Sequence, residues 1–259
     1  MNNLISKYSS TIKELSEGNA SRLFSGFSWV MVGSLMSKVL VFLATVLVAR
    51  ILSKEVYGQL SIIRSTINLF VSLSSFGIGA TATKYIAQYR TTDPTKAIKM
   101  YFVANAFVIV MAVVSCSILL VSADIIATNR LNRPEMSIEL RIASLILFFS
   151  VMNGAQTGTL SGFEDFKRIA KCQTLMGIVE IVSLCIGAYF FGLKGAVVGF
   201  GLTYCAAWLY NSIGIRKHLR SFDIPITYEL RRLNLSDFKP LLTFSLPVAA
   251  TSWIQIIDW

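Results

Sequence analysis

The sequence predicts an all-α polytopic membrane protein with six complete transmembrane helices and the start of a seventh. Hydrophobic residues make up 54% of the 259 residues and charged residues 15%, whereas soluble domains carry about 25% charged residues. The mean hydropathy is +0.62. Apolar runs of about 20 residues, long enough to span a hydrocarbon core, recur along the chain. This composition excludes a disordered chain, a coiled coil, a disulfide scaffold and an ordinary cytosolic enzyme.

The predicted spans follow one another with short connections. They cover residues 24–49, 57–80, 100–122, 141–161, 173–191 and 195–214, and a seventh begins near residue 241 and is cut off at 259. Only Gly192, Leu193 and Lys194 join the fifth and sixth spans, which predicts a tight helical hairpin. Residues 1–23 are polar, with apolar residues at helical spacing. They are not a cleavable signal peptide, and we expect either a cytoplasmic amphipathic helix on the membrane surface or a frayed tail.

Basic residues are distributed unequally between the two sides of the predicted bundle. The chain carries a net charge of +10. Sixteen Lys and Arg fall on the side of the N-terminus and five on the other, and three lie within or at the edge of spans. By the positive-inside rule, the N-terminus and the basic loop 215–240 are cytoplasmic. We therefore attribute the charge to membrane topology and expect membrane lipids, not nucleic acid, as partners.

Cysteine and histidine usage provides no catalytic or metal site. The four cysteines form no CxxC pair, and we interpret Cys116, Cys172, Cys185 and Cys205 as small hydrophobic residues. His218 is the only histidine. No Gly-rich phosphate loop of the Walker type occurs. We expect no catalytic residue, no metal and no cofactor, and therefore no enzyme.

Two adjacent spans each carry a polar stripe that contains one cation. In the second span the stripe consists of Ser61, Arg64, Ser65, Asn68, Ser72 and Ser75. In the first span it consists of Gly33, Ser34, Ser37, Lys38 and Thr45. Either the stripes pack helices together while the cations snorkel or pair with a carboxylate, or they line a water-filled cavity with a cationic floor. Lys38 lies near mid-span, which favours the cavity.

Other polar residues also lie inside predicted spans. Glu180, in the fifth span, is expected to pair with Lys38 or Arg64, to couple a proton or cation, or to stay protonated and shielded from lipid. In the fourth span, Asn153, Gln156 and Thr157 are candidates to face a cavity. Arg141 follows Glu139 near the start of that span, and we expect the two to form an interfacial ion pair.

The order of several short motifs resembles a known family. Residues 33–58 read GSLMSKVLVFLATVLVARILSKEVYG, residues 76–80 read FGIGA, and residues 191–196 read FGLKGA. The predicted seventh span opens with FSLP at residues 244–247 and reaches Asp258. Together these motifs resemble the polysaccharide (oligosaccharide) flippases, the Wzx-like branch of the multidrug/oligosaccharidyl-lipid/polysaccharide exporter superfamily, from about residue 24 to the end.

This resemblance implies a transporter of twelve to fourteen helices in two lobes, of which residues 24–214 match the first and residues 241–259 open the second. It implies the flipping of a polyprenyl-pyrophosphate-linked oligosaccharide across the bacterial inner membrane for O-antigen, capsule or exopolysaccharide synthesis. A polysaccharide polymerase and a chain-length regulator are then expected partners. By position, Lys38 and Arg64 match cavity cations that bind pyrophosphate, with Ser34, Ser61 and Asn68 beside them. Glu180 and Asp258 are the candidates for H⁺ or Na⁺ coupling.

Two other functions remain open at this point. A drug or metabolite antiporter of the same superfamily is one, although acidic cavity residues suit its cationic substrates better. A non-functional truncated remnant is the other, because such proteins exceed 400 residues and this chain stops inside a predicted helix. We expect the chain to be a fragment, and less readily a half-transporter that dimerises.

Overall fold

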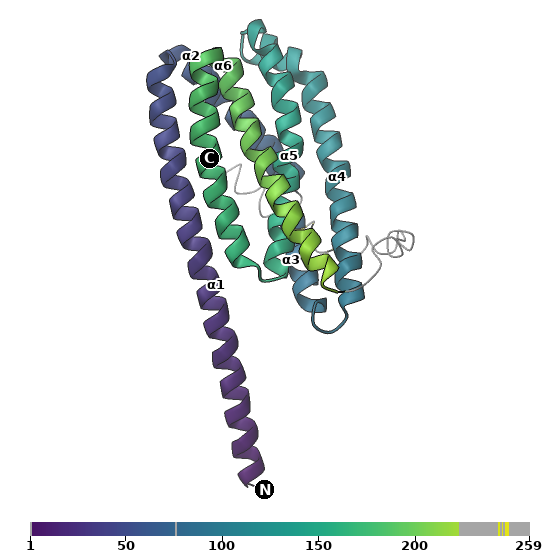
Figure 1. Ribbon diagram of the computed structural model, residues 1–259. Helices are drawn as coiled ribbons and strands as arrows, with labels where there is room; N and C mark the ends of the chain where they lie inside the picture. The colour runs from purple at the N-terminus through teal and green to yellow at the C-terminus, as the bar shows by residue number, and fades with distance from the viewer. Residues whose placement is uncertain (1, 76, 223–242, 244, 246, 249–259) are drawn as a thin grey trace.

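The computed structural model describes residues 2–75, 77–222, 243, 245, 247 and 248, with side chains from Gly26 onward except that of Phe27. Within these residues the regular structure is helical throughout, without strands (Figure 1). The α-helices are α1 (Asn2–Ile51), α2 (Lys54–Ser74), α3 (Ile78–Tyr89), α4 (Pro94–Ile125), α5 (Ser137–Gly162) and α6 (Phe166–Arg220). A π-helical turn, η1 (Ile126–Arg130), and a 3-10 turn, η2 (Pro134–Met136), connect α4 to α5.

Side-chain caps determine where three of the helices begin. The Ser53 hydroxyl accepts a hydrogen bond from the Val56 amide at 3.3 Å, before α2. Asp93 and Asp165 accept in the same way from the amide three residues ahead, at 3.2 Å each, before α4 and α6. These bonds satisfy backbone donors that have no partner in the first turn of a helix. The bond from the Lys96 amide also holds the pKa of the Asp93 carboxyl below its ordinary value.

The second predicted span is broken in the structure. The sequence predicts one helix over 57–80, but α2 ends at Ser74, α3 begins at Ile78, and the two are bent by 46°. Gly77 has φ +63°, a left-handed conformation that a right-handed helix cannot continue. A side chain at Gly77 would collide with Val248. The break is therefore also a point of contact for the chain that follows residue 222.

Helix α6 folds back on itself and confirms the predicted hairpin. Gly192 has φ +59° and ψ −135° inside it, so α6 consists of two antiparallel arms, 166–191 and 193–220. The Ser183 hydroxyl of the first arm donates to the Gly199 carbonyl of the second at 2.8 Å. Because glycine has no Cβ, Gly192 adopts its positive φ without strain.

The turn of the hairpin depends on backbone-to-backbone contact. A Cβ added at Gly187 would overlap the carbonyl of Gly195 in the other arm. We expect Gly187→Ala to destabilise the protein by about 1–3 kcal/mol, and to lower the melting temperature in detergent by about 2–4 °C per kcal/mol. Gly58→Ala is the matched control, since a Cβ there meets nothing within 4 Å. An equal loss in both variants would contradict the close-contact explanation.

Helix α1 is continuous across the boundary at which the sequence separates a tail from a span. It runs unbroken from Asn2 to Ile51, over both 1–23 and 24–49. By length and apolar composition, four of the described helices are able to cross a membrane, or five if α2 and α3 form one broken span. That total takes the two arms of α6 as one helix. The count of six complete spans stays a prediction, and most of the predicted seventh lies outside the described residues.

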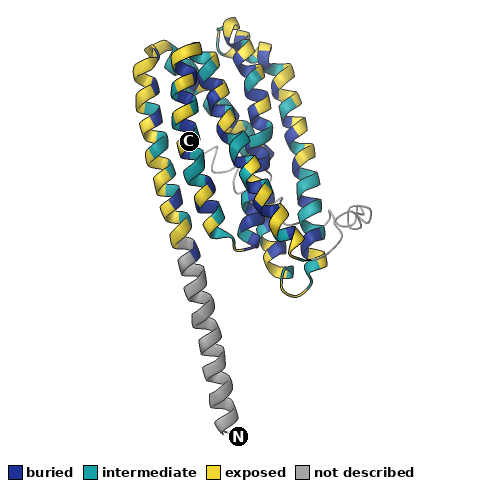
Figure 2. Cartoon of the chain, in the orientation of Figure 1, coloured by how far each residue is buried: buried dark blue, intermediate teal, exposed yellow. Residues whose placement is uncertain are grey.

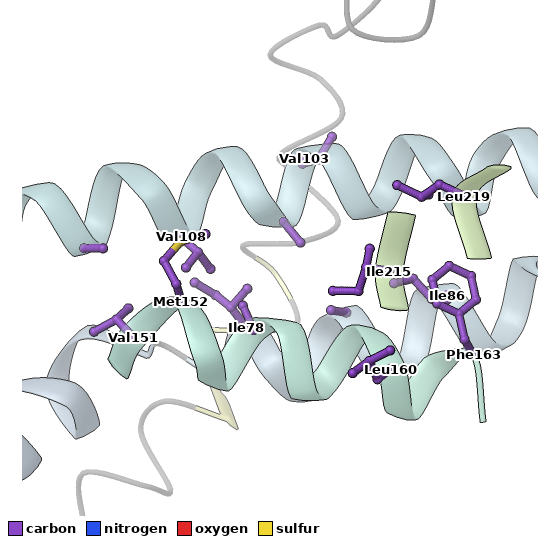
Figure 3. Packing of buried hydrophobic residues seen from close by; sticks show 14 of the residues in the cluster. Ile78, Ile86, Val103, Val108, Val151, Met152, Leu160, Phe163, Ile215 and Leu219 are labelled. Atoms are coloured by element: carbon purple, nitrogen blue, oxygen red, sulfur yellow. The ribbon is translucent and has the colours of Figure 1, made fainter. Parts of the chain in front are cut away.

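The apolar core is centred on α5. Residues of α3, α4, α5 and α6 form its larger cluster, including Ile86, Val108, Met152, Leu160 and Ile215 (Figure 3). In the most apolar 18-residue stretch of each helix, 61% of the residues are buried in α5 and only 11% in α1. Figure 2 shows exposed positions along most of the described length of α1. Helix α1 therefore lies at the edge of the bundle, with one face available to lipid or to another protein surface.

Candidate functional site

Helix α2 presents three different faces. Leu60, Ile63 and Ile67 are buried in the core, and Ile62 and Leu69 lie on an exposed apolar face. The predicted polar stripe runs between these two faces, and its members are exposed or half-buried: Ser61, Arg64, Ser65, Asn68, Ser72 and Ser75. A polar face that is distinct from both the core and the lipid-like face is typical of a helix beside an aqueous space.

Arg64 forms an ion pair with Glu180 of α6. The side chain of Arg64 is 22% exposed and that of Glu180 is 7% exposed. The Arg64 guanidinium also lies 4.5 Å from the ring centroid of Phe200 in the second arm of α6. Of the interpretations that the sequence leaves open for Glu180, the structure shows the pairing, and it shows the pairing with Arg64. Arg64 is thus a partly exposed cation whose counter-ion lies inside the protein.

Lys38 is the second cation of the site and lies on the exposed side of α1. Within the part of the chain that the structure describes, it has no hydrogen bond and no ion pair. Ser37 and Leu40 lie against Gly177, about one helical turn from Glu180. Lys38 therefore lies about one to two helical turns from the level of Glu180, on a helix that packs against the first arm of α6.

The neutral residues of the predicted site lie in different settings. Asn68 is exposed on α2, and Ser34 is half-buried on α1. The Ser61 hydroxyl donates to the Tyr57 carbonyl in its own helix at 3.0 Å and keeps its oxygen lone pairs free to accept. Asp258 lies outside the described residues.

The polar residues of α5 do not face a cavity as the sequence suggested. Asn153 and Gln156 are buried, and the Gln156 amide donates to the Ser212 hydroxyl of α6 at 2.9 Å. Thr157 donates to the Asn153 carbonyl at 3.0 Å. Asn153 and Gln156 join α5 to the α6 hairpin inside the lobe, since a buried polar group needs an internal partner. The expectation that Asn153 and Gln156 face a cavity is wrong, and for the half-buried Thr157 it stays a prediction.

The sequence did not predict the contacts at the open end of the α6 hairpin, where its first arm begins and its second arm ends. Arg168 donates to the Tyr210 carbonyl at 2.7 Å, and its guanidinium lies 4.5 Å from the Tyr210 ring centroid. His218 lies 2.8 Å from the Asp165 carboxylate and stacks on Phe163. The two residues of each pair are more than 40 positions apart, so local sequence patterns do not reveal these contacts. Asp165 alone carries a local signal, as a residue able to cap the start of α6.

The expected pairing of Arg141 with Glu139 is also wrong. Arg141 lies 2.7 Å from Asp124 at the exposed end of α4, whereas Glu139 is buried with one carboxylate oxygen unpartnered. Side chains two positions apart on a helix point in different directions, and this places Glu139 and Arg141 in separate environments. At the same end of the bundle, Glu55 pairs with Arg133 and raises the pKa of its guanidinium above the ordinary value.

The charged and polar side chains of α1 and α2 are suited to binding an anion. In the described part of the chain, no group of three or more His, Cys, Asp or Glu side chains is placed to hold a metal ion. Among the described residues of α1 and α2, the polar groups at mid-span include the exposed Lys38 ammonium, the partly exposed Arg64 guanidinium, and amide and hydroxyl groups. Such a set binds an anion that carries neutral hydrogen-bonding groups.

Comparison with known families decides how the chain is classified. A family model described as polysaccharide biosynthesis protein matches residues 23–258. This chain belongs to the polysaccharide biosynthesis protein family. The match confirms the resemblance drawn from the motifs between residue 33 and the end. An uncharacterised membrane protein of Methanocaldococcus jannaschii is 22% identical over 233 residues, which are 86% of this chain and 54% of that protein.

The fold of the chain is similar to that of solved transporters. An outward-facing multidrug resistance MATE family transporter of the MOP superfamily superposes with a TM-score of 0.72 and 18% identity. A MOP superfamily transporter from Pyrococcus furiosus, described as having a binding pocket of reverse polarity, superposes with a TM-score of 0.74 and 18% identity. Each match covers 87% of this chain and 51% of the other chain. The chain is thus a multi-pass membrane protein with the fold of these transporters, and it spans about half the length of these relatives.

Proposed function

We propose that this chain forms the first lobe of a flippase that moves a polyprenyl-pyrophosphate-linked oligosaccharide across the bacterial inner membrane for surface polysaccharide synthesis. The observation that carries the proposal is Lys38, which is exposed at mid-span on α1 and makes no hydrogen bond or ion pair among the described residues. A cation exposed at mid-span is costly in lipid, so it belongs on a face that meets water or an anion. Membership of the polysaccharide biosynthesis family supports this substrate class.

The roles of the site residues follow from their chemistry. Lys38 and Arg64 bind the two phosphates, because cations form the stronger, charge-assisted hydrogen bonds with phosphate oxygens. Asn68, Ser34 and Ser61 meet the hydroxyls of the sugars next to the pyrophosphate. The prenyl chain stays in lipid along the exposed apolar face of α1. A second lobe supplies the opposite wall, and the two lobes rock to expose the site alternately to each side of the membrane.

The orientation and the coupling belong to the same proposal. The N-terminus and the basic segment 215–240, which begins within the end of α6, are cytoplasmic. Residues 24–214 provide six spans, in which the broken pair α2–α3 counts as one span and each arm of α6 counts as one. Glu180 and Asp258 take part in coupling to H⁺ or Na⁺. A polysaccharide polymerase and a chain-length regulator act on the product on the outer side.

An antiporter for drugs or metabolites is the second candidate function. It is favoured by the similarity in fold to the multidrug resistance transporter and by the acid Glu180 at the site. Its cationic substrates would have to approach Lys38, which repels them. The sign of the substrate's charge therefore separates the two candidates.

Deletion of the gene tests the proposed function. We expect surface polysaccharide to be lost and lipid-linked repeat units to accumulate in the inner leaflet, with drug sensitivity unchanged. Restoration by the complete gene is the control. Unchanged polysaccharide together with increased drug sensitivity would reject the flippase and favour the antiporter.

A further inference from the structure

Arg64 lies between two competing anions. Its side chain is three times as exposed as that of Glu180, at 22% against 7%. One side of the guanidinium therefore contacts a carboxylate inside the lobe, and the other side is open to the polar stripe of α2. Phe200 of the second arm of α6 lies against the guanidinium. A ligand phosphate reaches Arg64 from the open side, whereas Glu180 remains enclosed.

We propose that the ligand's phosphate and Glu180 compete for Arg64, and that Glu180 takes up one proton when the phosphate binds. This inference rests on the proposed function and adds how the site is regulated. The N–H groups of Arg64 exchange a carboxylate oxygen for a phosphate oxygen. The proton comes from solvent and adds to the freed carboxylate oxygen of Glu180, and no covalent bond between heavy atoms breaks.

The balance of charge favours exchange over simple sharing of Arg64. Lys38 and Arg64 contribute two positive charges, and a sugar-linked pyrophosphate carries one negative charge on each of its two phosphates. With Glu180 ionised, the occupied site has one excess negative charge. With Glu180 protonated, the occupied site is neutral. An uncompensated charge on the enclosed carboxylate of Glu180 is unfavourable, so binding and protonation occur together.

The groups that face Glu180 provide no substitute cation. From α2 the charged neighbour is Arg64 itself. From the second arm of α6, the titratable neighbour of Glu180 is Tyr204. From α1, the residues near Gly177 are Ser37 and Leu40, and Lys38 beside them is exposed. Among the described residues, Glu180 therefore has no second cation to pair with once the phosphate takes Arg64, and a proton replaces it.

The test measures ligand binding and proton uptake together in the complete protein in detergent. The probe is a short-chain prenyl diphosphate sugar, in which both phosphates are esterified so that their charge is constant between about pH 6 and 8. We expect uptake of about one proton per bound probe and an affinity that falls about tenfold per pH unit as the pH rises. In Glu180→Gln we expect tighter binding, no proton uptake and no dependence on pH.

Glu139→Gln is the matched control, because Glu139 is also a buried carboxylate of the same bundle but lies in the first turn of α5, away from mid-span. We expect it to keep both the proton uptake and the pH dependence. Absence of proton uptake in the unmodified protein would overturn the exchange, even if Glu180→Gln failed to fold. If Lys38→Gln and Arg64→Gln leave binding of the probe unchanged, the proposed function itself is wrong. If they weaken binding but no proton is taken up, the function stands and the exchange does not.

Discussion

Replacing Arg64 with leucine is expected to destabilise the folded protein by about 3–5 kcal/mol, because Glu180 is left buried without its cation. The side chain of Glu180 is 7% exposed, and Arg64 is its ion-pair partner in the described residues. Thermal or denaturant unfolding of the purified protein in detergent measures the change. Glu180→Leu is expected to cost less, since the more exposed Arg64 is able to turn its guanidinium toward water.

The double variant Arg64→Leu/Glu180→Leu separates the loss of a partner from the loss of packing. With no charge left behind, we expect its stability to return to within about 1–2 kcal/mol of the unmodified protein. Binding of a pyrophosphate-linked ligand should stay weak, because a cation of the site is still missing. If the double variant is as unstable as Arg64→Leu, the destabilisation comes from lost contacts such as that with Phe200 and not from the buried charge.

Replacing Lys38 with glutamine is expected to reduce transport of the lipid-linked oligosaccharide strongly without affecting folding. One charge-assisted hydrogen bond to phosphate is worth about 1.5–3 kcal/mol, which is a loss of about 10–100-fold in affinity. Because Lys38 is exposed and makes no ion pair among the described residues, its removal leaves no internal group unpaired. The measurement is flipping of the labelled substrate in vesicles, together with the melting temperature.

Lys54→Gln is the control for Lys38. Lys54 is exposed at the start of α2, away from mid-span, and its replacement should leave transport unchanged. Equal transport by the Lys38 and Lys54 variants would show that surface charge in general, and not a cation at mid-span, supports the activity.

Local signals in the sequence were enough to predict several parts of this structure. The hairpin of α6 follows from Gly192 between two apolar runs, because glycine there permits the turn. The polar stripe of α2 follows from helical periodicity, and the structure keeps that stripe out of the core. The helical, membrane-spanning character follows from composition alone.

Other features depend on tertiary contacts, which the periodicity of the sequence does not reveal. Asn153 and Gln156 have the spacing of cavity residues, but their neighbours on α6 place them inside the lobe. The break at Gly77 was hidden in an apolar run, since glycine also occurs inside continuous transmembrane helices. Glu180 had two candidate cations in the sequence, and only the packing of α2 against the α6 hairpin selects Arg64.

The distance along the chain between Arg64 and its partner has a consequence for membrane insertion. The two residues are 116 positions apart, and a ribosome adds about 5–20 residues per second. Helix α2 therefore has to enter the bilayer several seconds before Glu180 has been synthesised, with its guanidinium still uncompensated. Until the first arm of α6 arrives, the unpaired guanidinium of Arg64 favours the aqueous side, and the ion pair with Glu180 then stabilises α2 in its final position.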